Sequence, residues 1–129
     1  MTFKMKNKDF LLIRGTVFPF DVLVTTENTS NLLSYIGQHE IELTPEEVEA
    51  LEMEDNVRGK TIPLSNKSIV IRLRDKRDVP VISHEISHAI FAMMEVVGIH
   101  LCEHTDEVFA YLQQYYLEEI MNHYKLWIK

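Results

Sequence analysis

The segment from residue 79 to residue 97 constrains the fold more than any other part of the chain, because its apolar residues recur with the spacing of a helix. These apolar residues are Ile82, Ile86, Ala89, Ile90, Met93 and Val97. His84 and His88 fall on the opposite side, where positions i and i+4 share one face. Asp78 is a suitable N-cap and Gly98 a suitable C-terminal stop. The sequence therefore predicts a long helix over about 79–97 with a core face and a separate histidine face.

Residues 84–88 read His-Glu-Ile-Ser-His, so a glutamate directly follows the first of the two histidines. Two imidazoles on one helix face can bind one Zn²⁺, and Glu85 can reach a water on that metal. A catalytic zinc usually takes three protein ligands, so a third ligand is expected farther along the chain. Metzincins place a glycine and a histidine after the second motif histidine, where this chain has Phe91 and Met94. The metzincin arrangement is therefore excluded.

Glu107 is the favoured third ligand, because it opens a second long helix predicted over about 105–124, which Thr105 can cap. The connection between the two helices gives the chain room to turn and send the second helix back past the metal. The motif at 84–88, together with Glu107-Val108-Phe109-Ala110-Tyr111, resembles the gluzincins. These are zinc peptidases whose third ligand is a glutamate on the helix after the motif helix.

The resemblance covers about residues 67–124 and extends, more loosely, to small zinc-peptidase-like domains encoded by phages and prophages. It implies that His84, His88 and Glu107 bind Zn²⁺ and that Glu85 is the general base. It also implies a minimal zincin-like fold. Each of these implications is an expectation about this chain.

Tyr111 lies one turn after Glu107 on the same predicted helix face and can donate a hydrogen bond to a developing oxyanion. The simpler interpretation is a tyrosine that packs against the motif helix. The connection between the helices holds further possible ligands, namely His100, Cys102, Glu103, His104 and Asp106. Cys102 with His104 would complete a closed structural zinc site, which remains an alternative. The Glu107 site is favoured because the connection lacks the paired cysteines of a zinc knuckle.

The charge and composition of the chain exclude several classes of partner. A net charge of −7 argues against nucleic acid, since phosphate binding needs clustered Lys and Arg. The acidity is concentrated between Glu40 and Asp55, where a solvated helix face is favoured over an acidic docking surface. No apolar run approaches the roughly 20 residues of a membrane span, so no membrane partner is expected. The single cysteine excludes an internal disulfide, which favours a cytoplasmic protein.

The N-terminal part of the chain predicts short strands and short helices. The strands are expected at 10–14, 20–25 and 67–74, the helices at about 31–36 and 45–54, and a loop is marked by Gly59 and Pro63. Because no repeat or linker interrupts the sequence, residues 1–129 are expected to form a single domain. The expected fold class is α+β, with a small, mostly antiparallel sheet packed on the two long C-terminal helices. The metal would lie between these helices and an edge of the sheet.

The expected function is hydrolysis of a peptide or protein substrate by a zinc-dependent peptidase, with Glu85 as the general base. The strand at 67–74 is expected at the sheet edge beside the cleft, where it would pair with an extended peptide. Arg72 and Arg74 would then flank the cleft, where they could hold an anionic substrate group, although exposed arginines on an edge strand usually serve only solubility. The alternative is a non-catalytic, zinc-stabilised interaction domain, which a closed four-ligand site would indicate.

Overall fold

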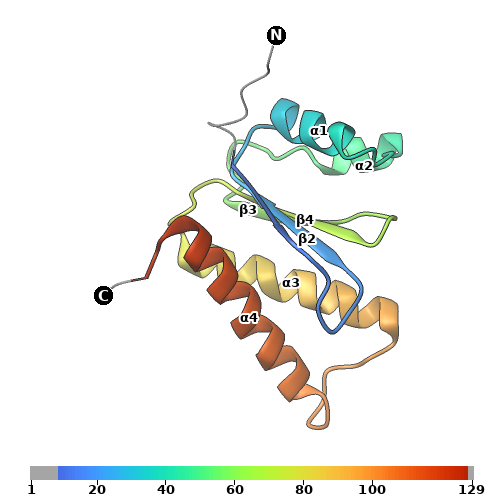
Figure 1. The fold of residues 1–129 in the computed structure, drawn as a ribbon, viewed down its shortest axis with the longest axis vertical. Coiled ribbons are helices and arrows are strands. Elements are labelled where there is room, and N and C mark those ends of the chain that lie inside the picture. Colours follow the sequence, from blue (N-terminus) through green and yellow to red (C-terminus); the bar gives the residue numbers. More distant parts are fainter. Residues whose placement is uncertain (1–8, 128–129) are drawn as a thin grey trace.

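The structure is a computed structural model that describes residues 9–127. It contains a central sheet covered by helices on both faces (Figure 1). In chain order the elements are β1 (Phe10–Ile13), β2 (Asp21–Thr25), α1 (Thr29–Gln38), α2 (Pro45–Ala50), β3 (Gly59–Pro63), β4 (Ser68–Leu73), α3 (Val79–Val97) and α4 (Asp106–Tyr124). One face of the sheet carries α1 and α2, and the other carries α3 and α4 (Figure 1). The α+β class and the two long C-terminal helices are therefore confirmed. The outermost residues of the expected single domain, 1–8 and 128–129, lie outside the described residues.

The strand order is β1-β2-β4-β3, which makes β1 and β3 the two edges of the sheet. β1 and β3 run antiparallel to their neighbours, whereas β2 and β4 run parallel to each other. The strand predicted at 67–74 is present as β4, but its predicted place at the edge is wrong, because β4 lies between β2 and β3. The edge strand packed against α3 is β3, so the loop predicted around Gly59 and Pro63 is also wrong. Glycine begins this strand and proline ends it, which are positions where both residues are compatible with a sheet edge.

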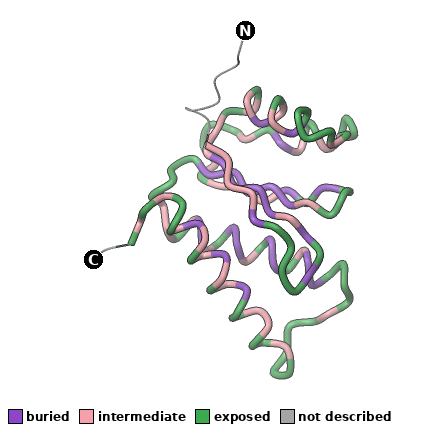
Figure 2. The backbone as a smooth tube through the Cα atoms, viewed as in Figure 1, coloured by how far each residue is buried: buried purple, intermediate pink, exposed green. Residues whose placement is uncertain are grey.

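Alternation along the strands divides their apolar residues between two cores, one on each face of the sheet. Figure 2 shows buried residues along the strands and on the helices on both sides of them. In β4, Ile69, Ile71 and Leu73 belong to the core shared with α3 and α4, whereas Val70 belongs to the core shared with α1. An interior strand of this kind is buried on both faces. No helix within residues 9–127 is long and apolar enough to cross a membrane.

The helix that carries the motif has the bounds that its capping residues predict. Asp78 accepts a hydrogen bond from the N–H of Val81 (3.4 Å), and Gly98 adopts the left-handed conformation (φ 77°) that ends helices. Its buried face consists of Ile82, Ile86, Ala89, Ile90, Met93 and Met94, with Glu85 at its margin. The prediction that Val97 belongs to this face is wrong, because the whole last turn, residues 95–98, is exposed.

Arg72 points into the core beneath α1 and α2, so its predicted exposure beside the cleft is wrong. Only 4% of it is exposed, and burial lowers the pKa of its guanidinium. Its Nη1 donates to the carbonyl of Leu51 (2.7 Å) and to the hydroxyl of Thr29 (3.0 Å). Its Nη2 donates to the carbonyl of Glu27 (2.9 Å). Because β4 is an interior strand, this side chain joins the loop after β2 to the start of α1 and the end of α2.

Candidate metal centre

His84 and His88 face each other on the exposed side of α3. Their Nε2 atoms are 3.1 Å apart, and their ring planes meet at 83°. Both residues are exposed, so the separate histidine face that the sequence predicts is confirmed. At this distance the two rings can share a hydrogen bond, in which one nitrogen donates and the other accepts.

The spacing of the two imidazoles fits two positions of a tetrahedral zinc site. Zinc–nitrogen bonds of about 2.0–2.1 Å at the tetrahedral angle place two ligating nitrogens about 3.3–3.4 Å apart. The separation of 3.1 Å is within a few tenths of an ångström of this value. The donor type fits as well, because imidazole nitrogen is a preferred ligand of zinc.

Glu85 lies on a different side of α3 and points toward β3. Its side chain is buried, and its Oε1 accepts a hydrogen bond from the hydroxyl of Thr61 (2.7 Å). The same hydroxyl lies 3.0 Å from the carbonyl oxygen of Glu85. Since a buried carboxylate without a partner is costly, Thr61 supplies the contact that allows Glu85 to remain in this position.

Gly59 allows β3 to lie close against α3. A Cβ atom at this position would lie 2.6 Å from Cγ1 of Val81 and 3.0 Å from Cγ of Glu85. It would also lie 3.2 Å from Oε2 of Glu85. The second carboxylate oxygen is therefore close to the main chain of Gly59, and any side chain there would push the strand away from the helix.

An open hollow of about 390 Å³ lies where β3 begins and the first turns of α3 pass beneath it. It is lined by Arg58, Gly59, Pro80, Val81, His84 and Glu85. The hollow therefore brings a motif histidine and the motif glutamate to one surface, with a guanidinium beside them. A metal-assisted hydrolysis needs a metal ligand and a base close together, and His88, the second motif histidine, lies outside this lining.

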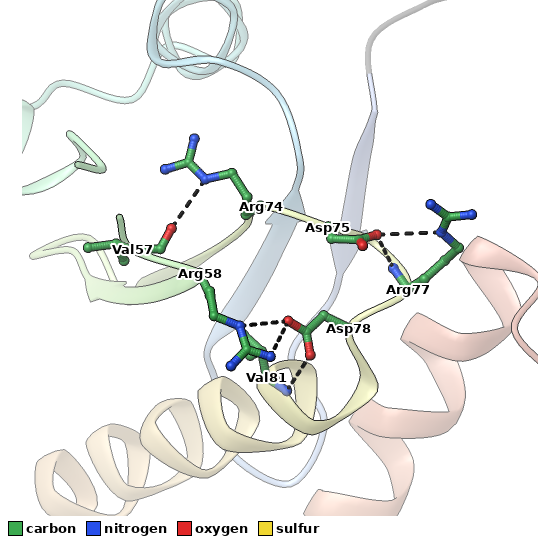
Figure 3. A network of polar contacts seen from close by, with 7 residues as sticks. All are labelled: Val57, Arg58, Arg74, Asp75, Arg77, Asp78 and Val81. Carbon is green, nitrogen blue, oxygen red and sulfur yellow. Dashed lines mark hydrogen bonds and ion pairs between the residues drawn. The ribbon is translucent and has the colours of Figure 1, made fainter. Parts of the chain in front are cut away.

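Arg58 is held in place by Asp78, the residue that caps α3. Its Nε and Nη2 donate to the same carboxylate oxygen of Asp78, at 3.0 and 2.7 Å (Figure 3). The other oxygen of Asp78 accepts the N–H of Val81. One carboxylate therefore fixes both the start of the motif helix and the orientation of the guanidinium.

The outer edge of β3 offers main-chain groups to this hollow. Leu64 donates its N–H to the carbonyl of Ser68 (2.8 Å), so even-numbered positions along β3 face β4. Main-chain groups alternate in direction along a strand, and those of Gly59 and Thr61 therefore face outward. Pro63 is also an outward position, where its missing N–H costs no bond to β4.

A polar bridge and an aromatic pair fix α4 beside α3. Gln113 donates from Nε2 to the carbonyl and hydroxyl oxygens of Ser83 (3.1 and 3.0 Å), and its Oε1 accepts from the hydroxyl of Ser87 (3.1 Å). Nearer the start of α4, the rings of Phe91 and Phe109 stack with centroids 5.0 Å apart. These contacts determine which residues of α4 lie near the histidine pair.

Glu107 and Tyr111 both lie on exposed positions of α4, and 61% of Tyr111 is exposed. Within residues 9–127, no three or more His, Cys, Asp or Glu side chains are arranged to hold a metal ion. The structure thus brings His84 and His88 together but does not bring Glu107 to them. The ligand role of Glu107 and the oxyanion role of Tyr111 stay predictions.

The other possible ligands are all exposed. His100, Cys102, Glu103 and His104 lie in the connection between the long helices, and Asp106 is the first residue of α4. A hydrogen bond from the backbone of His104 lowers the pKa of the Cys102 thiol, which favours the thiolate that metals bind. None of these residues forms a three-ligand group with the histidine pair in the described part of the chain, so this alternative also stays a prediction.

Three residues of the site, Arg58, Gly59 and Thr61, are missed by sequence reasoning. The glycine and proline at the two ends of β3 are typical of loops and outweigh the β-branched Thr61 and Ile62 between them. A strand between a glycine and a proline would have been found by giving more weight to these β-branched residues. Its contact with α3 depends on the fold and has no sequence signal.

Comparisons of the chain with protein-family models, with curated proteins and with solved structures find no match.

Proposed function

We propose that this protein is a zinc-dependent hydrolase that cleaves peptide bonds, with His84 and His88 as metal ligands and Glu85 as the general base. The observation that carries the proposal is the 3.1 Å separation of the two Nε2 atoms, next to a hollow that contains Glu85. Glu85 adds a carboxylate beside His84 in this hollow, which a zinc-dependent hydrolase needs as its base. The exposed, unpaired thiol of Cys102 supports the further proposal of a cytoplasmic location.

Zinc held by His84 and His88 would act as a Lewis acid that polarises the scissile carbonyl and lowers the pKa of a water ligand to about 7. As the third ligand we propose Glu107, on the basis of the gluzincin resemblance. Its exposed place in the first turn of a helix packed against α3 supports this assignment.

Glu85 carries the proton in this proposal. Thr61 holds Oε1, and Oε2 lies beside the main chain of Gly59 at the hollow. While the water oxygen attacks the carbonyl carbon, Glu85 accepts a proton from it. When the carbon–nitrogen bond breaks, the same carboxyl group returns a proton to the leaving amine, so the products are a new carboxylate terminus and a new amino terminus.

The free edge of β3 would position the substrate. An extended peptide can add to a sheet edge through main-chain hydrogen bonds, and Gly59 and Thr61 offer outward groups for this purpose. The same strand holds Glu85 through the hydroxyl of Thr61. Substrate binding would therefore use the outer edge of β3, and proton transfer would use the face of β3 that packs against α3.

A non-catalytic, zinc-stabilised interaction domain is the second candidate. The Thr61–Glu85 hydrogen bond favours it, because this bond joins β3 to α3 whether or not any chemistry takes place. In that case zinc would still bind, but Glu85 would serve only the fold.

The two candidates are separated by measuring zinc content and peptide hydrolysis in the same preparations. Glu85→Gln should keep zinc, by elemental analysis, and lose hydrolysis of a quenched-fluorescent peptide library by about 10²–10⁴-fold. His88→Ala should lose zinc, whereas His39→Ala, at the distant end of α1, should change neither quantity. Hydrolysis by Glu85→Gln at the wild-type rate would reject the proposed base. Zinc binding without hydrolysis of any library peptide by the wild type would support the interaction domain.

A further inference from the structure

We infer that Arg58 recognises a carboxylate of the substrate, close to the cleaved bond and on its C-terminal side. This inference rests on the proposed function and adds a substrate class to it. The carboxylate can belong to an acidic side chain or to the C-terminus of a short peptide, because both present the same group to a guanidinium.

The orientation of Arg58 leaves one end of its guanidinium available. Asp78 takes up Nε and Nη2, and the planar fork therefore directs Nη1 away from Asp78 (Figure 3). The side chain is 68% exposed and lines the hollow together with His84 and Glu85. No other Lys or Arg of the described chain lines this hollow.

Asp78 engages two of the three guanidinium nitrogens of Arg58. Asp78 contacts the guanidinium through one oxygen, while its other oxygen accepts a main-chain N–H at the start of α3. The same carboxylate therefore interacts both with the positive end of the α3 dipole and with Arg58. The Nη1 end of the guanidinium, which Asp78 does not contact, can therefore donate to a substrate carboxylate at the rim of the hollow.

The direction of β3 determines which end of a peptide meets Arg58. Arg58 stands immediately before the strand, whose outward main-chain groups belong to Gly59 and Thr61. A peptide that pairs antiparallel with this edge runs in the opposite direction, so its C-terminal side passes Arg58. Glu85, the proposed base, is hydrogen-bonded to Thr61 and lies beside Gly59, so the cleaved bond would lie along this part of the strand. At about 3.3 Å per residue, a carboxylate bound to Arg58 belongs one or two residues after the cleaved bond.

The test measures binding rather than turnover, with the full chain free of added metal so that the probes stay intact. Three acetylated tetrapeptides are titrated into ¹⁵N-labelled protein: tetra-alanine with a free C-terminus, the same peptide as its amide, and Ala-Ala-Ala-Asp as its amide. At least one of the two carboxylate peptides should bind about tenfold more tightly than the tetra-alanine amide and should shift the amide signals of Gly59 and Thr61. Preference for the free acid identifies a C-terminal carboxylate, and preference for the aspartate peptide identifies an acidic side chain.

Arg58→Gln should abolish the difference between the peptides. Arg77→Gln is the matched control, because Arg77 is an exposed arginine paired with Asp75 (3.6 Å) and does not line the hollow (Figure 3). Arg58→Lys should keep part of the preference, since it keeps the charge and loses the fork. Equal binding of all three peptides to the wild type, absence of binding by all three, or equal effects of the Arg58 and Arg77 substitutions would overturn the inference. The zinc-content and Glu85→Gln measurements do not depend on Arg58, so the proposed function can stand if this inference fails.

Discussion

The hydroxyl of Thr61 donates to Oε1 of Glu85 at 2.7 Å and thereby joins the edge strand β3 to the motif helix α3. This contact ties the proposed general base to the strand that would bind the substrate. Its loss should therefore affect stability and hydrolysis together while leaving the two histidines unchanged.

Replacing Thr61 by valine keeps the shape of the side chain and removes the donor. Glu85 would be left as a buried carboxylate without this partner, so the free energy of unfolding should fall by about 1–3 kcal/mol. Urea denaturation measures this loss, and hydrolysis should fall in the same variant at unchanged zinc content. Thr61→Ser retains a hydroxyl and should stay close to the wild type in both measurements. If Thr61→Val is as stable and as active as Thr61→Ser, the hydrogen bond has no role.

Gly59→Ala should separate β3 from α3. Its Cβ would meet Cγ1 of Val81 at 2.6 Å, so the strand or the Val81 side chain must shift, at a cost of about 1–3 kcal/mol in unfolding free energy. Gly37→Ala is the matched control, because a Cβ at that helical position meets nothing within 4 Å and should stabilise α1 by about 0.5–1 kcal/mol. Combining Gly59→Ala with Val81→Ala should recover part of the loss in thermal or urea unfolding. An additive double substitution would show that this contact does not cause the destabilisation.

The sequence predicts the motif helix well because all of its signals are local. Asp78 and Gly98 set its ends, and the period of the apolar residues assigns its core face. The histidine pair follows from the same period, since residues four apart on a helix always share a face. These features depend on helix geometry alone and not on where other elements lie.

The surroundings of the motif depend on strand order, which the sequence does not reveal. Arg72 alternates with apolar neighbours as an exposed strand residue would, but the parallel pairing of β2 with β4 buries it. β3 lies at the edge of the sheet instead. Its Gly59 is a residue typical of loops, but here it is required because the strand lies close to Val81. Such contacts between distant segments determine the site. They leave no periodic pattern in the sequence from which they could be predicted.

Arg72 should be important for stability because it is a buried cation with only neutral acceptors. Arg72→Met would leave the carbonyls of Glu27 and Leu51 without their donors, and the free energy of unfolding should fall by about 2–4 kcal/mol. Arg14→Met is the control, since the Arg14 side chain is 78% exposed and its ion pair with Asp21 measures 3.4 Å. That substitution should change stability by less than about 0.5 kcal/mol. Equal urea midpoints for the two variants would contradict a structural role of Arg72.

Glu107→Ala tests the proposed third ligand, and its result bears on whether α4 would have to move for zinc to bind. The stacking of Phe91 on Phe109 and the bridge from Gln113 hold α4 beside α3, and Glu107 lies in the exposed first turn before these contacts. Loss of a zinc ligand should weaken zinc binding by at least about 100-fold, measured by competition with a chromophoric chelator, with little change in the metal-free stability. Glu103→Ala removes an exposed carboxylate from the preceding connection and should leave the affinity unchanged. If Glu103→Ala or Cys102→Ala weakens zinc binding and Glu107→Ala does not, the third ligand comes from the connection between α3 and α4, and the first turn of α4 has no need to approach the histidines.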